Sequence, residues 1–138
     1  MAEIRNVFDI ASRALSSQVT RLNAVASNLA NARSIAGSSE EAYRAVRPVF
    51  KTRYADDFAR SGLSTTDVTQ IVSLDRQPEK VYEPEHPKAD DQGFVYVAAV
   101  DTDEELVEML EASRQYQNTL EVVSTVRALM MRTINMGR

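Results

Sequence analysis

The sequence predicts a mainly α-helical chain with a small β-rich insertion, whose long N- and C-terminal helices pair as a coiled-coil-like hairpin or bundle. Residues 1–32 contain neither Gly nor Pro, and none occurs between residues 102 and 136. All four Pro and three of the four Gly of the 138-residue chain lie in residues 33–101. Because Gly and Pro interrupt helices, we expect an N-terminal helix over 1–32, a β-rich middle module over 33–101 and a C-terminal helix over 102–138, together one domain.

The N-terminal helix carries an apolar stripe with a seven-residue repeat. Phe8, Leu15, Leu22 and Leu29 share one position of the repeat, and Val25 takes the complementary one. A period of 3.5 residues keeps a stripe straight along a neighbouring helix, which is typical of coiled coils. The repeat therefore predicts that this helix packs against a second helix.

Three asparagines, Asn23, Asn28 and Asn31, occur within this helical pattern although Asn is a mediocre helix former. They have two interpretations. In the first, they are polar residues near the end and on the wet face of the helix. In the second, the neighbouring Ala and Ser residues allow close helix packing while the amides fix the register through hydrogen bonds. The spacing alone leaves both open.

The C-terminal helix is predicted from a capping box, in which Thr102 precedes Glu105 by three residues. Its apolar face comprises Leu106, Met109, Leu110, Tyr116, Leu120, Val123, Met130 and Ile134. Antiparallel pairing of the terminal helices would bring Arg21 and Arg33 beside the acidic start near 103–111. A hairpin of two helices covers only part of each apolar stripe, so we expect Val19, Ala26, Leu110 and Met131 to remain available to other subunits.

The middle module is predicted to contain short strands. Runs rich in β-branched and aromatic residues occur at Val46–Tyr54, Val68–Leu74 and Phe94–Val100, the last with the alternation typical of a strand. Residues 83–87 should form an extended loop, because each residue that precedes a proline avoids the helical region.

Composition excludes several classes of function. The net charge is −4 and the pI near 5.0, so no basic excess is present to bind nucleic acid. The absence of Cys excludes disulfides and thiolate metal sites, and a single histidine, His86, makes catalytic relays and multi-histidine metal centres poor candidates. We expect no enzyme, no cofactor, no metal and no small-molecule substrate, and we interpret the acidic surroundings of His86 as a solvated loop rather than a cation site.

No apolar stretch reaches the roughly 20 residues of a membrane-spanning helix, and charges at Glu3, Arg5, Asp9 and Arg13 leave no apolar core for a secretory signal. We therefore expect a protein that stays in the cytosol or leaves it by a route that reads no such signal.

Several segments resemble one family. The segment Leu22–Ala32 (LNAVASNLANA) is similar to the N-terminal signature of bacterial flagellar axial proteins. The segments Tyr82–Asp90, Gly93–Val97 and Glu108–Asn118 extend the resemblance to the flagellar basal-body rod proteins of the proximal rod. This resemblance implies export without a cleaved signal peptide through the flagellar type III apparatus, and assembly into a hollow drive shaft in the periplasm. The implied partners are other rod proteins, copies of the chain itself, and the base of the rod at the membrane ring and export gate.

Together with the apolar stripes of the two helices, this resemblance implies a structural rod subunit that assembles through its terminal helices. The expected assembly interface comprises Phe8, Leu15, Leu22, Val25, Asn28, Leu29, Asn31, Leu106, Met109, Ser113, Tyr116, Leu120, Val123 and Met130. The alternative is a cytosolic helical-hairpin module, such as a chaperone or adaptor, which presents the same stripe to a partner.

Overall fold

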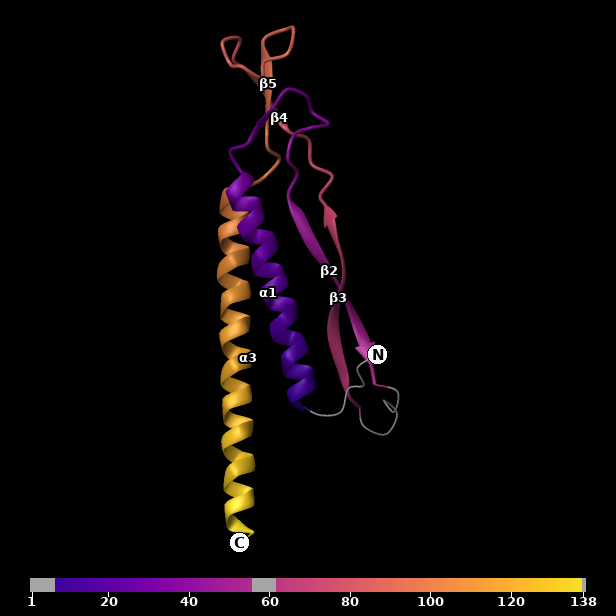
Figure 1. Ribbon diagram of the computed structural model, residues 1–138, viewed down its shortest axis with the longest axis vertical. Helices are drawn as coiled ribbons and strands as arrows, with labels where there is room; N and C mark the ends of the chain where they lie inside the picture. Colours follow the sequence, from indigo (N-terminus) through magenta and orange to yellow (C-terminus); the bar gives the residue numbers. More distant parts are fainter. Residues whose placement is uncertain (1–6, 56–61, 138) are drawn as a thin grey trace.

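The computed structural model describes residues 7–55 and 62–137 and contains two long helices beside a β-hairpin (Figure 1). The elements are α1 (Val7–Asn31), β1 (Ile35–Ala36), β2 (Val46–Tyr54), β3 (Ser64–Ser73), β4 (Glu79–Tyr82), β5 (Phe94–Val97) and α3 (Thr102–Met136). Residues 1–6 of the predicted N-terminal helix, and Arg138 at the end of the C-terminal one, lie outside the described residues. The prediction of a mainly helical fold with a small β insertion is confirmed.

Helix α1 is the middle layer of the molecule. Helix α3 lies along one side of it and the β2–β3 hairpin along the other (Figure 1). The two helices are antiparallel, and α3, with 35 residues against 25 in α1, continues past the beginning of α1 (Figure 1). The lower part of α3 therefore extends beyond the described part of its partner helix.

The start of α3 differs from the predicted capping box. Asp101, not Thr102, is the N-cap, and its carboxylate accepts hydrogen bonds from the backbone N–H groups of Asp103 at 3.0 Å and Glu104 at 3.2 Å. Glu105 does not serve as the box partner, because its side chain turns inward and is buried. Aspartate caps a helix at least as well as threonine, so the helix begins where predicted with a different capping residue.

Strands β2 and β3 form a two-stranded antiparallel sheet, with a β-bulge between Val49 and Phe50. Strand β2 has the predicted bounds, whereas β3 begins at Ser64, ahead of the predicted start at Val68. The polar run 64–67 gives no apolar signal but pairs fully with β2. The hairpin is held to α1 by polar contacts: Ser17 Oγ donates to the carbonyl oxygen of Thr66 at 3.0 Å, and Arg13 pairs with Asp67 at 3.1 Å.

A second sheet, in the order β1-β5-β4, lies at the end of the molecule where α1 ends and α3 begins (Figure 1). Strand β1 has only two residues, and the sequence of β4, EKVY, has no alternation of apolar and polar side chains, so neither strand was predicted. Strand β5 ends at Val97 instead of the predicted Val100, because the next two N–H groups leave the sheet. Ala98 N–H donates to Ser34 O at 3.0 Å and Ala99 N–H to Tyr43 O at 2.8 Å.

The interior consists mainly of small side chains. Among the described residues, the buried hydrophobic positions are Val25, Val95 and nine alanines: Ala11, Ala24, Ala32, Ala42, Ala45, Ala55, Ala98, Ala99 and Ala112. The chain exposes 9652 Å², about a third more than the roughly 7,200 Å² expected for a compact monomer of its mass. This subunit therefore buries little large apolar surface on its own.

Candidate assembly site

A buried amide joins the three layers of the molecule. Asn28 of α1 has no solvent exposure, and its side chain makes four hydrogen bonds. Its Oδ1 accepts from Val46 N–H at 2.8 Å and from the Tyr43 hydroxyl at 3.0 Å, while its Nδ2 donates to Val46 O and to Glu105 Oε2, both at 3.0 Å. All the hydrogen-bonding capacity of the amide is used. Asn28 thus holds the first residue of β2 against both helices.

Glu105 is the second member of this cluster. Its side chain is 1% exposed and forms an ion pair with Arg47 of β2, with Arg47 Nη1 lying 2.6 Å from Oε1 and 2.8 Å from Oε2. A carboxylate buried without a partner is strongly destabilising, whereas a paired and hydrogen-bonded one is tolerated. Asn28, Tyr43, Arg47 and Glu105, which we term the polar node, therefore satisfy one another's hydrogen bonds and charges in the space between α1, β2 and α3.

The node continues to the surface through a pair of charged side chains. Arg76 donates to Glu104 at 2.7 and 3.1 Å, and Arg47 Nη2 lies 3.3 Å from Glu104 Oε1. The hydrogen bond from Arg76 holds the pKa of Glu104 below its usual value, and the same contact raises the pKa of Arg76. These charges are largely solvated, so they orient the node more than they stabilise it.

The node resolves the two interpretations of the asparagines in α1. Asn28 fixes register through hydrogen bonds, as the second interpretation proposed, but it does so between elements of its own chain. Asn23 is exposed, and Asn31 donates to the Ser27 carbonyl oxygen one turn earlier, at 2.9 Å. Each asparagine therefore has a different environment, and Asn28 is the one whose side chain bonds to residues far away in the sequence.

Polar contacts also fix the pairing of α1 with α3. Arg21 Nε donates to Glu108 Oε2 at 2.9 Å, and Gln18 Nε2 donates to Gln115 Oε1 at 2.9 Å. The first contact confirms the predicted placement of Arg21 beside the acidic start of the C-terminal helix. Arg33 is exposed and forms no ion pair among the described residues.

The expected interface residues have three kinds of environment. Val25 and Asn28 are buried within the chain. The half-buried set comprises Phe8, Leu15, Leu22, Leu29, Asn31, Met109, Ser113, Tyr116 and Val123. Leu106, Leu120 and Met130 are 50%, 43% and 46% exposed. The exposed and half-buried members retain surface that a neighbouring subunit could cover.

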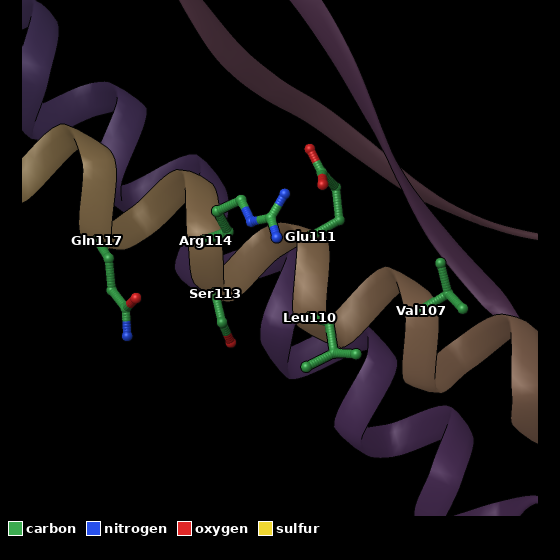
Figure 2. A pocket seen from close by; sticks show the side chains of 6 residues that line it. All are labelled: Val107, Leu110, Glu111, Ser113, Arg114 and Gln117. Carbon is green, nitrogen blue, oxygen red and sulfur yellow. The ribbon is translucent and has the colours of Figure 1, made fainter.

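The residues expected to remain outside the hairpin are exposed. Val19, Ala26, Leu110 and Met131 all lie at the surface, Leu110 to 71%. A shallow groove of about 420 Å³ lies on α3 beside Leu110, and Figure 2 shows Leu110, Ser113 and Gln117 projecting from the same side of the helix. The helix pair therefore presents apolar surface to its surroundings.

The loop that contains His86 is folded back on itself. His86 Nδ1 accepts from Lys88 N–H at 3.1 Å, and Lys88 Nζ donates to the Ile35 carbonyl oxygen at 2.9 Å. Asp90 Oδ1 accepts from the backbone N–H groups of Gln92 and Phe94, and the bond to Phe94 lowers the pKa of Asp90. Over the described residues, no three His, Asp or Glu side chains are grouped as they would be to hold a metal ion.

None of the helices in the described part of the chain is both long and apolar enough to span a membrane.

Comparisons with known proteins identify the family. A model of the C-terminal part of the flagellar basal body rod FlgEFG proteins matches residues 91–136. The flagellar basal-body rod protein FlgC of Escherichia coli O6:H1 is 42% identical over 133 residues, which cover 96% of this chain and 97% of the relative. The chain belongs to the FlgC family. FlgC of Salmonella typhimurium is 42% identical with the same coverage, and FlgC of Aquifex aeolicus is 30% identical over 96% of both chains.

Membership of the FlgC family confirms the resemblance to flagellar basal-body rod proteins. These relatives are named as rod proteins and not as enzymes, which agrees with the prediction that the chain has no catalytic role.

Sequence reasoning missed three members of the polar node. The sequence assigned Glu105 to a capping box, and neither Tyr43, between Ala42 and Arg44, nor Arg47, between Val46 and Pro48, belongs to a recognisable motif. The available signal was indirect. Glu105 lies one heptad before Ala112, so both residues lie on the inward face of α3, where an apolar side chain is expected, and both are buried. A charged residue at such a position indicates a buried partner.

Proposed function

We propose that this chain is a structural subunit of the flagellar rod, assembled with its neighbours through the faces of α1 and α3 that its own fold leaves exposed. Its place is the proximal rod in the periplasm, reached through the flagellar type III apparatus. The partners are copies of itself, other rod proteins, and the base of the rod at the membrane ring and export gate. The terminal helices pair in the manner of coiled coils, both within a subunit and between subunits.

The observation that carries this proposal is the number of large apolar side chains on α3 that lack cover. Leu106, Val107, Leu110, Leu120, Val122, Leu129, Met130, Met131 and Ile134 are all at least 43% exposed. Contiguous apolar surface of this kind marks an interaction site in soluble proteins. Fully burying each such side chain contributes on the order of 1.5–3 kcal/mol, so a contact that covers several of them is strongly favourable.

The shape of the subunit supports the same role. Its interior of alanines and its large exposed surface leave the isolated chain with little apolar burial, and helices in proteins draw most of their stability from packing of an apolar face. We therefore expect folding of the helix ends to be completed by assembly. A drive shaft gains rigidity from this arrangement, because every subunit is stabilised by its neighbours.

The experiment is to replace Leu120 with Asp in the host bacterium and measure motility and the amount of the chain in purified basal bodies. Burying an unpaired charge is costly, so we expect L120D to be exported but excluded from the rod, with loss of swimming. Asn118→Asp is the matched control, because it adds the same charge at an exposed position two residues away. Normal swimming and normal incorporation of L120D would show that this face of α3 is not an assembly surface.

A further inference from the structure

Both long helices carry a second seam that the packing within the chain does not use. On α3 it comprises Leu106, Leu110, Ser113, Gln117, Leu120 and Met131, which we term the outer seam; all but the half-buried Ser113 are exposed. On α1 it comprises Ser12, Ser16, Val19, Asn23, Ala26 and Ala30, all exposed, which we term the small seam. Leu110, Ser113 and Gln117 of the outer seam lie together in Figure 2.

The spacing of each seam is that of a coiled-coil contact face. Intervals of four and three residues alternate along the small seam from Ser12 to Ala30, and along the outer seam from Leu106 to Leu120. This alternation aligns a row of side chains with a neighbouring helix. The α1–α3 contact within the chain uses other positions, such as Gln18 and Gln115. Each helix can therefore pack against two helices at once.

The two seams are complementary in size. Leucines at 50%, 71% and 43% exposure dominate the outer seam, while the small seam consists of two Ser, two Ala, one Val and one Asn. Small side chains let the helix backbones approach, and large ones fill the holes between them. Two outer seams facing one another would crowd leucines, and two small seams would bury little apolar surface. The match is thus between unlike seams.

Charge favours an antiparallel orientation of the two seams. Arg33, exposed and without an ion pair in the described part of the chain, lies just after the end of α1. Asp103 lies exposed at the start of α3, beside the outer seam. The contact between α1 and α3 within one chain has a defined register, in which Gln18 meets Gln115. If the outer seam of one copy meets the small seam of another in this register, Leu106 lies beside Ala26 and Ser113 beside Val19. Asp103 then lies toward Arg33.

We propose that the outer seam of one copy of this chain docks antiparallel on the small seam of a second copy that points in the same direction. This inference rests on the proposed rod function and assigns the partner of its exposed helix face. Because the seams lie on different helices, each copy offers one to each of two neighbours. Such a head-to-tail contact builds rows or helical arrays rather than closed pairs, with α1 and α3 alternating around the shaft.

Disulfide trapping tests the proposal, since the chain contains no Cys of its own. Cells would co-express one chain with Ala26→Cys and a differently tagged chain with Leu106→Cys, and basal bodies would be oxidised with copper phenanthroline. We expect a cross-linked dimer that carries both tags. Each chain holds one thiol, so this product joins two copies. A second pair, Ser16→Cys with Gln117→Cys, should cross-link likewise, whereas Ala26→Cys with Gln70→Cys on the hairpin should not.

The results separate this proposal from the rod function itself. If the substituted chains enter basal bodies and cells swim but neither seam pair cross-links, the seam assignment is overturned and the rod function stands. A cross-link from Ala26→Cys to another rod protein, instead of a second copy, also overturns it. If the chain is absent from basal bodies, the rod function itself fails.

Added bulk provides an independent measurement. Ala26→Leu fills the small seam without touching the interior, and should weaken each contact by about tenfold and so reduce swimming strongly. The matched control, Ala128→Leu, makes the same change at an exposed position of α3 outside the outer seam. Equal motility of the two variants would contradict docking at Ala26.

Discussion

Replacing Asn28 with alanine tests whether the polar node holds the layers of the subunit together. The substitution removes all four hydrogen bonds of a side chain with no solvent exposure. Val46 N–H loses its acceptor, and Glu105 loses one donor while it keeps Arg47. An orphaned buried group costs about 1–3 kcal/mol, so we expect a loss of about 2–4 kcal/mol. That is a large part of the 5–15 kcal/mol typical of a domain.

The assay is urea unfolding of the purified chain followed by far-UV circular dichroism, together with a thermal melt. A loss of this size should lower the Tm by roughly 10 °C. Asn23→Ala is the matched control, because Asn23 lies on the same helix, is exposed, and makes no side-chain hydrogen bond among the described residues. Alanine is the better helix former, so the control should be neutral or slightly stabilising. Equal stability of the two variants would refute the role of the node.

Three further predictions concern other parts of the subunit. The pKa of Glu104 is lowered in the fold, so its contacts with Arg76 stabilise the subunit above the usual pKa of 4.5, and this stabilisation is lost as the pH falls through the lowered pKa. In E104Q the urea midpoint should therefore change less with pH in the acid range. A pH profile identical to that of the unmodified chain would contradict this. Gly93 has φ of 80°, and a Cβ there would lie 2.9 Å from the Tyr82 ring, so G93A should cost more than about 2 kcal/mol. Gly62 has φ of 65°, and a Cβ there would meet no atom of the described residues within 4 Å, so Gly62→Ala should cost only the backbone strain of about 1–2 kcal/mol. Equal unfolding midpoints of the two variants would refute the difference. A dilute solution of the chain should show less helix by circular dichroism than the 25 residues of α1 and 35 of α3; full helix content with a sharp two-state melt would contradict assembly-coupled ordering.

The local pattern of the sequence was sufficient for the helices and for one strand. The absence of Gly and Pro and the heptad repeat place α1 and α3, and the aromatic and β-branched run 46–54 gives β2 its bounds. Short-range physics decides these elements, because propensity and periodicity both act within one element.

Long-range contacts account for what the sequence did not reveal. Strand β4 depends on pairing with β5, because its sequence, two charged residues followed by Val81 and Tyr82, has no alternation of apolar and polar side chains. The role of Asn28 depends on Val46, 18 residues away, and on Glu105, 77 residues away. From the sequence alone, Asn28 could be a polar residue near the end of the helix or a residue that fixes the register of packing, and only the position of β2 decides between the two. The sequence predicted part of the two seams, because the apolar stripes are wider than one helix contact covers, and this width indicated that Val19, Ala26 and Leu110 stay exposed.

The central claim is that neighbouring subunits cover the exposed face of the helix pair when the chain is in the rod. Thiol labelling of Leu110→Cys tests it most directly, because Leu110 is 71% exposed in the isolated subunit and the chain has no other thiol. A maleimide reagent should modify the purified chain quickly and the same residue in intact basal bodies at least about tenfold more slowly. Equal labelling rates in the two states would contradict the account.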